Sequence, residues 1–409
     1  MKKLFILFIV SFCSSIILSC NTENNANYVF PKSSDCTTKV LAYETFVKNC
    51  VNTRDNTEIY PYHYGGAFLS ENGNLIVKTT DLTPENQQDI LNQFGVDDIT
   101  FIECEYSYND LLNVKSQIDD YLIRNSQTEK LDNIQSVYID VQKNRVVVCL
   151  DSCLENDIAK FKSEIYSSEL IEFEEHKNIS NGENKTTKAR FNKQSHVINV
   201  NLSTGNLLCD NHSNIDSLTY ASVAYRAQHN SGIKGFVTSA NIAKYYGETI
   251  YSCIGLKTPV AMTMLSKQQD EINAAFCQLT GATIDNNLLY NNAYFTYSTV
   301  APPQPNAFMP GNTVLFYGAN AMSSNNNLPI SSSIYGANCT VVGYNNITYT
   351  GLIMSRYLTQ NGADCGGLVA GLYAIRQLRV YGIHLITIGS NSYFIPAYTI
   401  NQEFNLSIY

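Results

Sequence analysis

The stretch Val380-Tyr381-Gly382-Ile383-His384-Leu385-Ile386-Thr387-Ile388 decides the fold class, because it is rich in β-branched side chains and belongs to a long series of similar runs. Such short runs recur at intervals of about ten residues, a spacing that is typical of all-β sandwiches and barrels. The other runs are 219–224, 235–238, 249–254, 274–279, 313–317, 340–343, 348–354, 368–373 and 393–400. Unpaired strand edges on a surface with so few charges would aggregate, so closed barrels are favoured.

The distribution of charge divides the chain into two halves. Residues 21–195 hold 17 Lys and Arg against 28 Asp and Glu, a balance of −11, whereas residues 196–409 hold 8 of each kind. Residues 176–195 are polar and lack apolar periodicity, which is typical of a linker. We therefore expect one domain over residues 36–175 and a second over residues 196–409.

The first domain combines strand and helix patterns. An Asn72-Gly73 pair between two apolar runs predicts a β-hairpin, and residues 137–141 and 146–150 predict a second one around a polar turn. Thr83-Pro84 is a typical helix start, and residues 109–125 repeat apolar side chains at spacings of three and four. These patterns predict an α+β domain.

Residues 1–20 are predicted to be an export signal. A positive start at Met1-Lys2-Lys3 precedes an apolar run that is too short for a spanning helix and suits a signal peptide. The run ends in Ile17-Leu18-Ser19-Cys20, which resembles a bacterial lipobox. Two acyl chains on Cys20 would anchor the exported protein stably, with residues 21–35 as a tether. The alternative is ordinary cleavage and release of a free secreted protein.

The composition excludes nucleic-acid binding. The formal net charge is −9, whereas proteins that bind nucleic acid usually carry a basic face. No two cysteines form a CxxC pair, and no histidine lies near the closest pair in sequence, Cys149 and Cys153. We therefore expect no metal site. Nothing in the sequence implies a cofactor.

Three segments of the β half carry a resemblance to a known family. They are Gly235-Phe236-Val237-Thr238-Ser239-Ala240-Asn241, Asn273-Ala274-Ala275-Phe276 and Gly362-Ala363-Asp364-Cys365-Gly366-Gly367. In this order they are similar to the GFVTAGH, DAAF and GDSGGP segments of trypsin-like endopeptidases of the bacterial streptogrisin and α-lytic type. The acidic half is similar to the pro-regions that precede such enzymes. The resemblance implies an α+β pro-region-like domain followed by an all-β chymotrypsin-like double β-barrel.

The resemblance also implies that all three positions of the catalytic triad are changed. Asn241 stands at the histidine position, Asn273 at the aspartate position and Cys365 at the serine position. A triad works because an imidazole accepts the proton of the nucleophile while a carboxylate orients the ring and balances its charge. Carboxamides do not titrate, so neither asparagine can take over those roles. Loss of the base costs on the order of ten thousand to a million in turnover, which outweighs the nucleophilicity of a thiol.

The loop around the nucleophile position departs from the family pattern as well. Ala363 stands where the family has a glycine whose amide forms half of the oxyanion hole, and the amide of Cys365 would form the other half. A methyl group at that glycine position restricts any backbone conformation with positive φ. Asp364 is expected to hold the loop through an ion pair or backbone hydrogen bonds.

Several other residues of the β half have expected roles or positions. The segment Gly382-Ile383-His384 matches the strand that lines the substrate site in the family. The cysteines that flank the family's histidine are missing, and a bridge between Cys209 and Cys253 is one alternative for that region. Arg376 and Arg379 are expected to be exposed.

Three functions stay open at this point. The first is an inactive peptidase homologue in the cell envelope, or secreted, that binds a peptide or protein and reaches the membrane only through Cys20. The second is a cysteine endopeptidase in which Cys365 is served by an unrecognised base, His384 or His229. The third is a surface adhesin. We interpret Cys365 as a remnant of catalytic decay, and the oligomeric state stays open.

Overall fold

The computed structural model describes residues 33–51, 59–131, 133–176, 200–210, 219–253, 257–269, 271–291, 293–343, 346–356, 358–359, 364–374 and 376–409. Met1–Asp35 and Cys36–Tyr409 are separate compact units, and both β-barrels belong to the second. None of the described helices is long and apolar enough to cross a membrane. Cys20, Ala363 and most of the predicted linker lie outside the described residues, and the predicted domain boundaries stay predictions.

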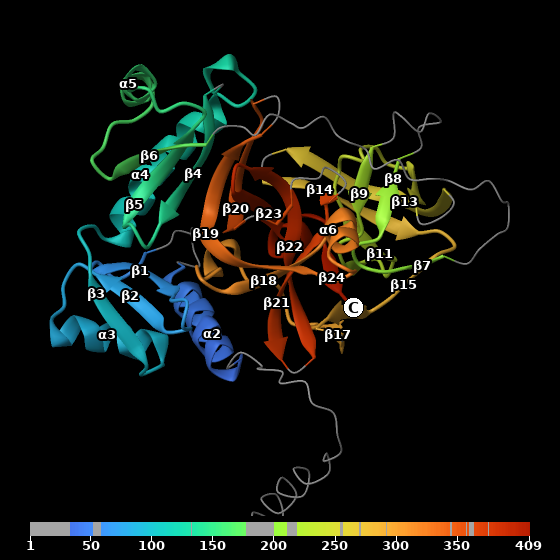
Figure 1. Cartoon of the computed structure of the whole chain (residues 1–409), viewed down its shortest axis with the longest axis horizontal. Helices are drawn as coiled ribbons and strands as arrows, with labels where there is room; N and C mark the ends of the chain where they lie inside the picture. Colours follow the sequence, from blue (N-terminus) through green and yellow to red (C-terminus); the bar gives the residue numbers. More distant parts are fainter. Residues whose placement is uncertain are drawn as a thin grey trace, which may run out of the picture. The chain divides into compact units, whose positions relative to one another are not determined.

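The N-terminal part of the second unit is α+β, as predicted (Figure 1). Its elements are α2 (Ser33–Cys50), β1 (Tyr64–Leu69), β2 (Leu75–Thr79), α3 (Pro84–Phe94), β3 (Ile99–Glu103), α4 (Tyr108–Arg124), β4 (Ile134–Asp140), β5 (Arg145–Leu150), α5 (Glu155–Glu164) and β6 (Ile171–Glu175). Both predicted hairpins form, because β1 pairs with β2 and β4 pairs with β5 in antiparallel register. A third strand then pairs in parallel with each hairpin: β3 pairs with β2, and β6 pairs with β5.

Local sequence explains where the helices of this part begin and end. Pro84 occupies the first turn of α3, and the helix ends at Gly95, whose φ of 67° suits glycine. Before α4, the Ser107 side chain accepts a hydrogen bond from the Asp110 amide, and the Asp110 side chain accepts one from the Ser107 amide. This reciprocal cap satisfies amides that would otherwise lack partners. The predicted helix over residues 109–125 is therefore confirmed within one residue.

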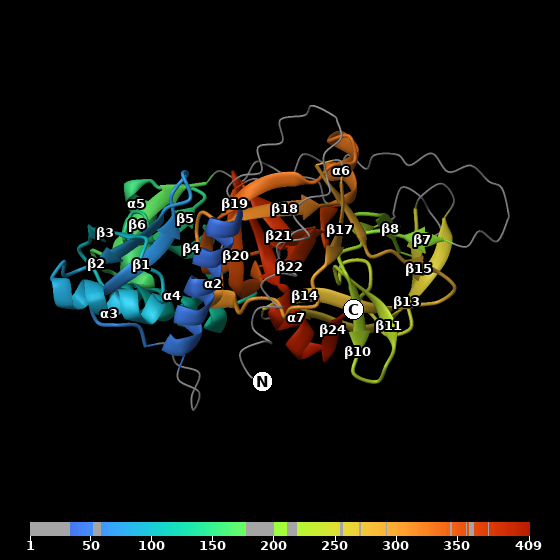
Figure 2. The same ribbon diagram turned by 90° about the horizontal axis from the view of Figure 1, so that it is seen from below.

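The first barrel is a closed antiparallel sheet, seen in the yellow-green part of Figure 2. Its strands are β8 (Leu207–Cys209), β9 (Tyr220–Ser222), β10 (Arg226–His229), β11 (Lys234–Thr238), β12 (Thr249–Ser252), β13 (Thr258–Gln269) and β14 (Ile272–Leu279). Closure comes from the segment between β9 and β10. There the Val223 amide donates to the Asn206 carbonyl at 2.9 Å, and the Ala224 amide donates to the Val237 carbonyl at 3.0 Å. One bent segment thus pairs with β8 at one end and with β11 at the other, which curls the sheet into a barrel, and β24 (Leu406–Ile408) adds to the outer side of β10.

The second barrel closes through strand pairing alone. It consists of β18 (Thr313–Tyr317), β19 (Ile330–Val342), β20 (Thr348–Arg356), β21 (Leu368–Ala374), β22 (Gln377–Ile388) and β23 (Asn391–Pro396). The ring runs β18, β19, β20, β23, β22, β21 and back to β18, with every pair antiparallel. The predicted double β-barrel is therefore confirmed.

Strand β19 also extends beyond its own barrel. Thr340 pairs with Val137 and Val341 with Ser136 of β4, so the sheet of β4, β5 and β6 continues that of the second barrel. Main-chain pairing therefore joins the α+β part to the barrel.

Two expectations about single residues can be tested directly. Cys209 and Cys253 form a disulfide, which confirms the alternative pairing. The expectation that Arg379 is exposed is wrong, because only 7% of it is accessible and it forms an ion pair with Glu44 of α2. Arg376, three residues earlier, has φ of 56° in the turn between β21 and β22.

Candidate functional site

The loop that carries Cys365 is held by the fully buried Asp364. Its carboxylate accepts hydrogen bonds from the amides of Asn320 at 2.7 Å and Ala321 at 3.2 Å, at the start of α6 (Ala319–Ser324). The Thr359 hydroxyl donates to the other carboxylate oxygen at 2.6 Å. Burial raises the pKa of Asp364, and these hydrogen bonds oppose that rise. Asp364 was expected to hold the loop through an ion pair or through backbone hydrogen bonds, and the structure shows backbone hydrogen bonds.

Gly366, the residue after Cys365, fixes the path of the same loop. Its φ is 75°, and a Cβ atom there would lie 2.4 Å from the amide nitrogen of Ser239, so no other residue fits. The Gly366 amide donates to the His384 carbonyl and the His384 amide donates to the Gly367 carbonyl, both at 2.9 Å. The loop is thereby tied to β22 and to the end of β11.

The structure brings together the three residues at the predicted triad positions. Asn241 follows β11, Asn273 lies in β14, and Cys365 lies in the loop before β21. The Asn273 side-chain amide donates to Asn241 Oδ1 at 3.3 Å, and Gln268 Nε2 donates to the same oxygen at 3.1 Å. The Asn241 side chain also lies close enough to Cys365 to lower the pKa of that thiol, although burial outweighs this effect. Gln268 lies beside Asn273 in the β13–β14 register and was not anticipated from the sequence.

The hydrogen bonds at this site run in the opposite sense to those of a triad. In a triad the base accepts the proton of the nucleophile, and the acid accepts the proton of the base. Here Asn273 and Gln268 donate to Asn241 Oδ1, and the thiol donates to the Leu385 carbonyl at 3.4 Å. Burial, and next the Asp364 carboxylate, raise the pKa of Cys365 to about 12. The thiol therefore keeps its proton at neutral pH.

Neither histidine that could serve as a base reaches the sulfur. The His384 Nε2 atom contacts the Thr387 hydroxyl at 3.0 Å, and burial lowers the pKa of His384 to about 3. His229 hydrogen-bonds Ser231 in the turn after β10. Among the described residues, no histidine hydrogen-bonds Cys365; His196 and His212 fall outside them.

The predicted substrate strand has no free edge at Gly382-Ile383-His384. All three residues pair with β23 on one side. On the other side, Gly382 and Ile383 pair with β21, and His384 hydrogen-bonds the loop before β21. A β-bulge follows: His384 opposes Phe394 and Ile386 opposes Tyr393, which leaves Leu385 without a partner on β23. Bulges commonly redirect groups at functional sites, and here the bulge accompanies the contact between the Leu385 carbonyl and Cys365. After the bulge, residues 386–388 of β22 pair with β23 and with no other strand in the described part of the chain.

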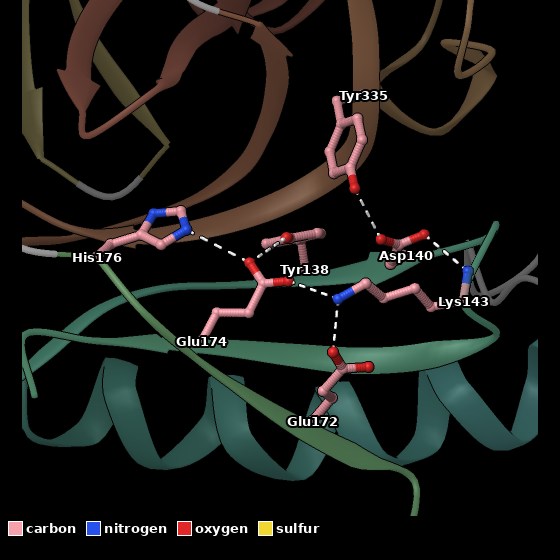
Figure 3. Close-up of polar contacts among 7 residues, drawn as sticks. All are labelled: Tyr138, Asp140, Lys143, Glu172, Glu174, His176 and Tyr335. Atoms are coloured by element: carbon pink, nitrogen blue, oxygen red, sulfur yellow. Dashed lines mark hydrogen bonds and ion pairs between the residues drawn. The ribbon is translucent and has the colours of Figure 1, made fainter. Parts of the chain in front are cut away.

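A second cluster of titratable side chains lies on β5 and β6 of the α+β part. The ligand atoms of Cys149, Glu174 and His176 all lie within 4.8 Å of one another. Figure 3 shows the imidazole of His176 directed at Glu174, which also contacts Tyr138 and Lys143. No sequence pattern indicated this cluster, because no histidine lies near Cys149 along the chain. His176 is distant in sequence, and the parallel pairing of β5 with β6 brings it close.

Comparisons with known proteins find one family model and several solved structures that this chain is similar to. A family model described as a Pro-like C-terminal domain matches residues 109–176. Among solved structures, the chain is similar to Nocardiopsis protease, at 18% identity, and to Thermobifida fusca protease A, at 16%; each match covers 51% of this chain and 98% of the other, with a TM-score of 0.39. An alpha-lytic protease homologue, N4, matches at 15% identity over 51% of this chain and all of its own, with a TM-score of 0.39. No curated protein sequence matches.

Proposed function

We propose that this chain is an exported peptidase homologue that lacks peptidase activity and binds a peptide or protein. The observation that carries the proposal is that Asn273 donates to Asn241 Oδ1 and that the Cys365 thiol donates to the Leu385 carbonyl, so no titratable side chain accepts the thiol proton. The thiol donates to a backbone carbonyl, which cannot store a proton, and neither asparagine side chain titrates. Attack by the thiol requires a base, and the described residues around the sulfur offer none.

Binding would use the edge of β22 beyond the bulge. Residues 386–388 have one side paired with β23, and no described strand pairs with the other side, where an extended peptide would add. Addition of a strand to a sheet edge needs main-chain groups only, so it survives the loss of a triad. Tyr245 and Tyr246, shortly after Asn241, are 69% and 80% exposed. Exposed tyrosines are common at protein-binding surfaces.

The proposal predicts that Cys365 is unreactive at neutral pH. With a pKa of about 12, the thiolate fraction at pH 8 is roughly a thousandfold below that of an ordinary cysteine, so alkylation should be slower by a similar factor. The rate should rise about tenfold per pH unit between pH 7 and 10, because the thiolate is the reactive form. Mass spectrometry of peptides after timed alkylation measures this rate, and the same cysteine in denaturant is the reference.

A peptidase would give a different set of results. Fast labelling of Cys365 at pH 7 that is lost in His384→Ala or His229→Ala would identify a base and overturn the proposal. Self-cleavage near Lys188 or Arg190 that disappears in Cys365→Ala would do the same. We expect instead that wild-type protein and Cys365→Ala leave casein equally intact.

Export and anchoring are a separate part of the proposal and rest on the sequence around Cys20. Protein purified from the membrane fraction should have the mass of residues 20–409 plus a diacylglyceryl-type modification. Cys20→Ser should move the protein to the soluble fraction, whereas Cys13→Ser, within the same apolar run, should not. A mature protein that starts after Cys20 and carries no lipid would show that it is freely secreted.

A further inference from the structure

We propose that Cys149, Glu174 and His176 form a binding site for one divalent transition-metal cation of the zinc class. The site would fasten the end of β6 to β5, in the α+β part of the chain. It is independent of the peptidase-like site and of the function proposed for it.

The backbone already places the three ligands. Cys149 and Glu174 are direct partners in the parallel register of β5 and β6. The amide of His176 donates to the carbonyl of Leu150 at 2.8 Å, which holds the histidine two residues beyond Glu174 along the extended chain. Sites built on paired strands hold their ligands more accurately than sites on loops. The arrangement therefore does not depend on flexible segments.

The spacing of the nitrogen and oxygen ligands suits a tetrahedral ion. His176 Nε2 and Glu174 Oε2 are 3.3 Å apart. Zinc bonds of about 2.0–2.2 Å to nitrogen and oxygen at a tetrahedral angle separate two such ligands by about 3.4 Å. One edge of the coordination polyhedron is thus preformed, and the Cys149 sulfur lies within 4.8 Å of the ligand atoms of both residues. The Nδ1 atom of His176 is buried and makes no hydrogen bond with any described residue.

Neighbouring side chains orient the carboxylate and leave one oxygen for the ion. Lys143 Nζ lies 2.6 Å from Glu174 Oε1, whereas Oε2 faces His176 and the Tyr138 hydroxyl, the latter at 3.3 Å (Figure 3). Lys143 also pairs with Glu172 at 2.5 Å. Such contacts around a ligand fix its orientation and tune its affinity.

The local charge also favours a dication. A metal-bound Cys149 thiolate and the carboxylates of Glu172 and Glu174 carry three negative charges against the one positive charge of Lys143, which leaves −2. A thiolate, an imidazole and a carboxylate together select zinc-like ions over magnesium or calcium. Cys149 is fully buried, while the side chains of Glu174 and His176 are 27% and 13% exposed, so an ion can enter from their side. Three protein ligands leave a fourth position for water or a small ligand.

The test is metal binding by the purified, folded chain after removal of metal with a chelator. Titration with Co²⁺ should give one equivalent of bound ion with a thiolate-to-cobalt charge-transfer band, and Zn²⁺ should displace it. Cys149→Ser should abolish that band, and His176→Gln or Glu174→Gln should weaken binding by at least about 100-fold. Tyr138→Phe should weaken it by about 10-fold to 100-fold, the usual effect of losing a group that orients a ligand.

Matched controls separate this site from general thiol or histidine binding. Cys153→Ser, on the same segment, and His229→Gln, in the first barrel, should bind Co²⁺ like the wild type. If Cys149→Ser fails to fold, His176→Gln still decides the question, because it alters a side chain at the end of β6. Failure of the wild type to bind one equivalent would overturn the proposal. Retention of wild-type affinity in both His176→Gln and Glu174→Gln would overturn it equally.

Discussion

In the double variant Asn241→His/Asn273→Asp, Cys365 should be alkylated at pH 7 at least about a thousand times faster than in the wild-type chain. The side chain of Asn241 already contacts both the sulfur and Asn273, so an imidazole there would have the same neighbours. Cysteines paired with histidine have pKa values as low as about 3 to 4. Even a pKa of about 8 would raise the thiolate fraction at pH 7 from about 10⁻⁵ to about 10⁻¹.

The single variant Asn273→Asp is the matched control for this experiment. It adds the carboxylate without the ring, and a negative charge near the thiol disfavours the thiolate. Its labelling should therefore be no faster than that of the wild type. Alkylation rates should level off above the new thiol pKa in the double variant, whereas in the control they should rise about tenfold per pH unit from about pH 6 to 9. A folded double variant that reacts as slowly as the wild type would show that residue 241 does not act on the sulfur.

Peptide hydrolysis is a separate measurement in the same variants. A reactive thiolate attacks a carbonyl productively only if amides stabilise the developing oxyanion. One of these amides would belong to Ala363, whose placement falls outside the described residues. Fast alkylation without hydrolysis would therefore indicate that the oxyanion hole also prevents catalysis, whereas both together would show that Asn241 and Asn273 suffice to explain the proposed inactivity.

Features that depend on neighbouring residues could be predicted from the sequence. Pro84 and Gly95 set the limits of α3, and the Asn72-Gly73 pair set the first hairpin, because turn and cap preferences are local. The barrels followed from the repeated strand pattern and from the cost of unpaired edges. The meeting of Asn241 with Asn273 and Cys365 was predictable only through the family resemblance, since no local rule fixes the pairing of β11 with β14.

Features that depend on register between distant strands could not be predicted. The bulge at Leu385 directs a carbonyl to the sulfur, and no residue type marks a bulge of this kind. The proximity of Cys149 and His176 depends on parallel pairing across an intervening helix. Arg379 was expected to be exposed because no acidic partner lies near it in the sequence. Its partner, Glu44, is 335 positions away in the chain.

The ion pair between Arg379 and Glu44 supports a second prediction with a large effect. The variant Arg379→Met should lower the free energy of unfolding by about 3–5 kcal/mol, because this is the usual cost of leaving a buried charge without its partner. The Arg379 Nη1 atom lies 2.8 and 2.7 Å from the two oxygens of Glu44, and its Nε atom donates to the Ala301 carbonyl at 2.8 Å. Only 9% and 14% of the two side chains are exposed. Methionine keeps most of the packing volume and removes the charge.

The loss in Arg379→Met should depend on pH in a defined direction. Burial raises the pKa of Glu44 even in the wild type, and Arg379 opposes that rise, so its removal raises the pKa further. A carboxyl group whose folded pKa exceeds its unfolded pKa of about 4.3 favours the folded state as the pH falls. The deficit relative to wild type should therefore be largest at neutral pH and should shrink as the pH falls through the raised pKa of Glu44 in the variant. Urea unfolding monitored by circular dichroism at several pH values measures it.

Two further variants establish that charge, and not packing, causes the loss. Lys244→Met changes an exposed cation of the first barrel and should alter stability by no more than about 0.5 kcal/mol. Arg379→Met/Glu44→Leu removes both charges, and replacement of a whole buried pair by apolar residues is often neutral or stabilising. The double variant should therefore recover most of the stability that the single variant loses. If both lose the same amount at every pH, the contribution of Arg379 comes from its contacts with the barrel, such as the Ala301 carbonyl, and not from Glu44.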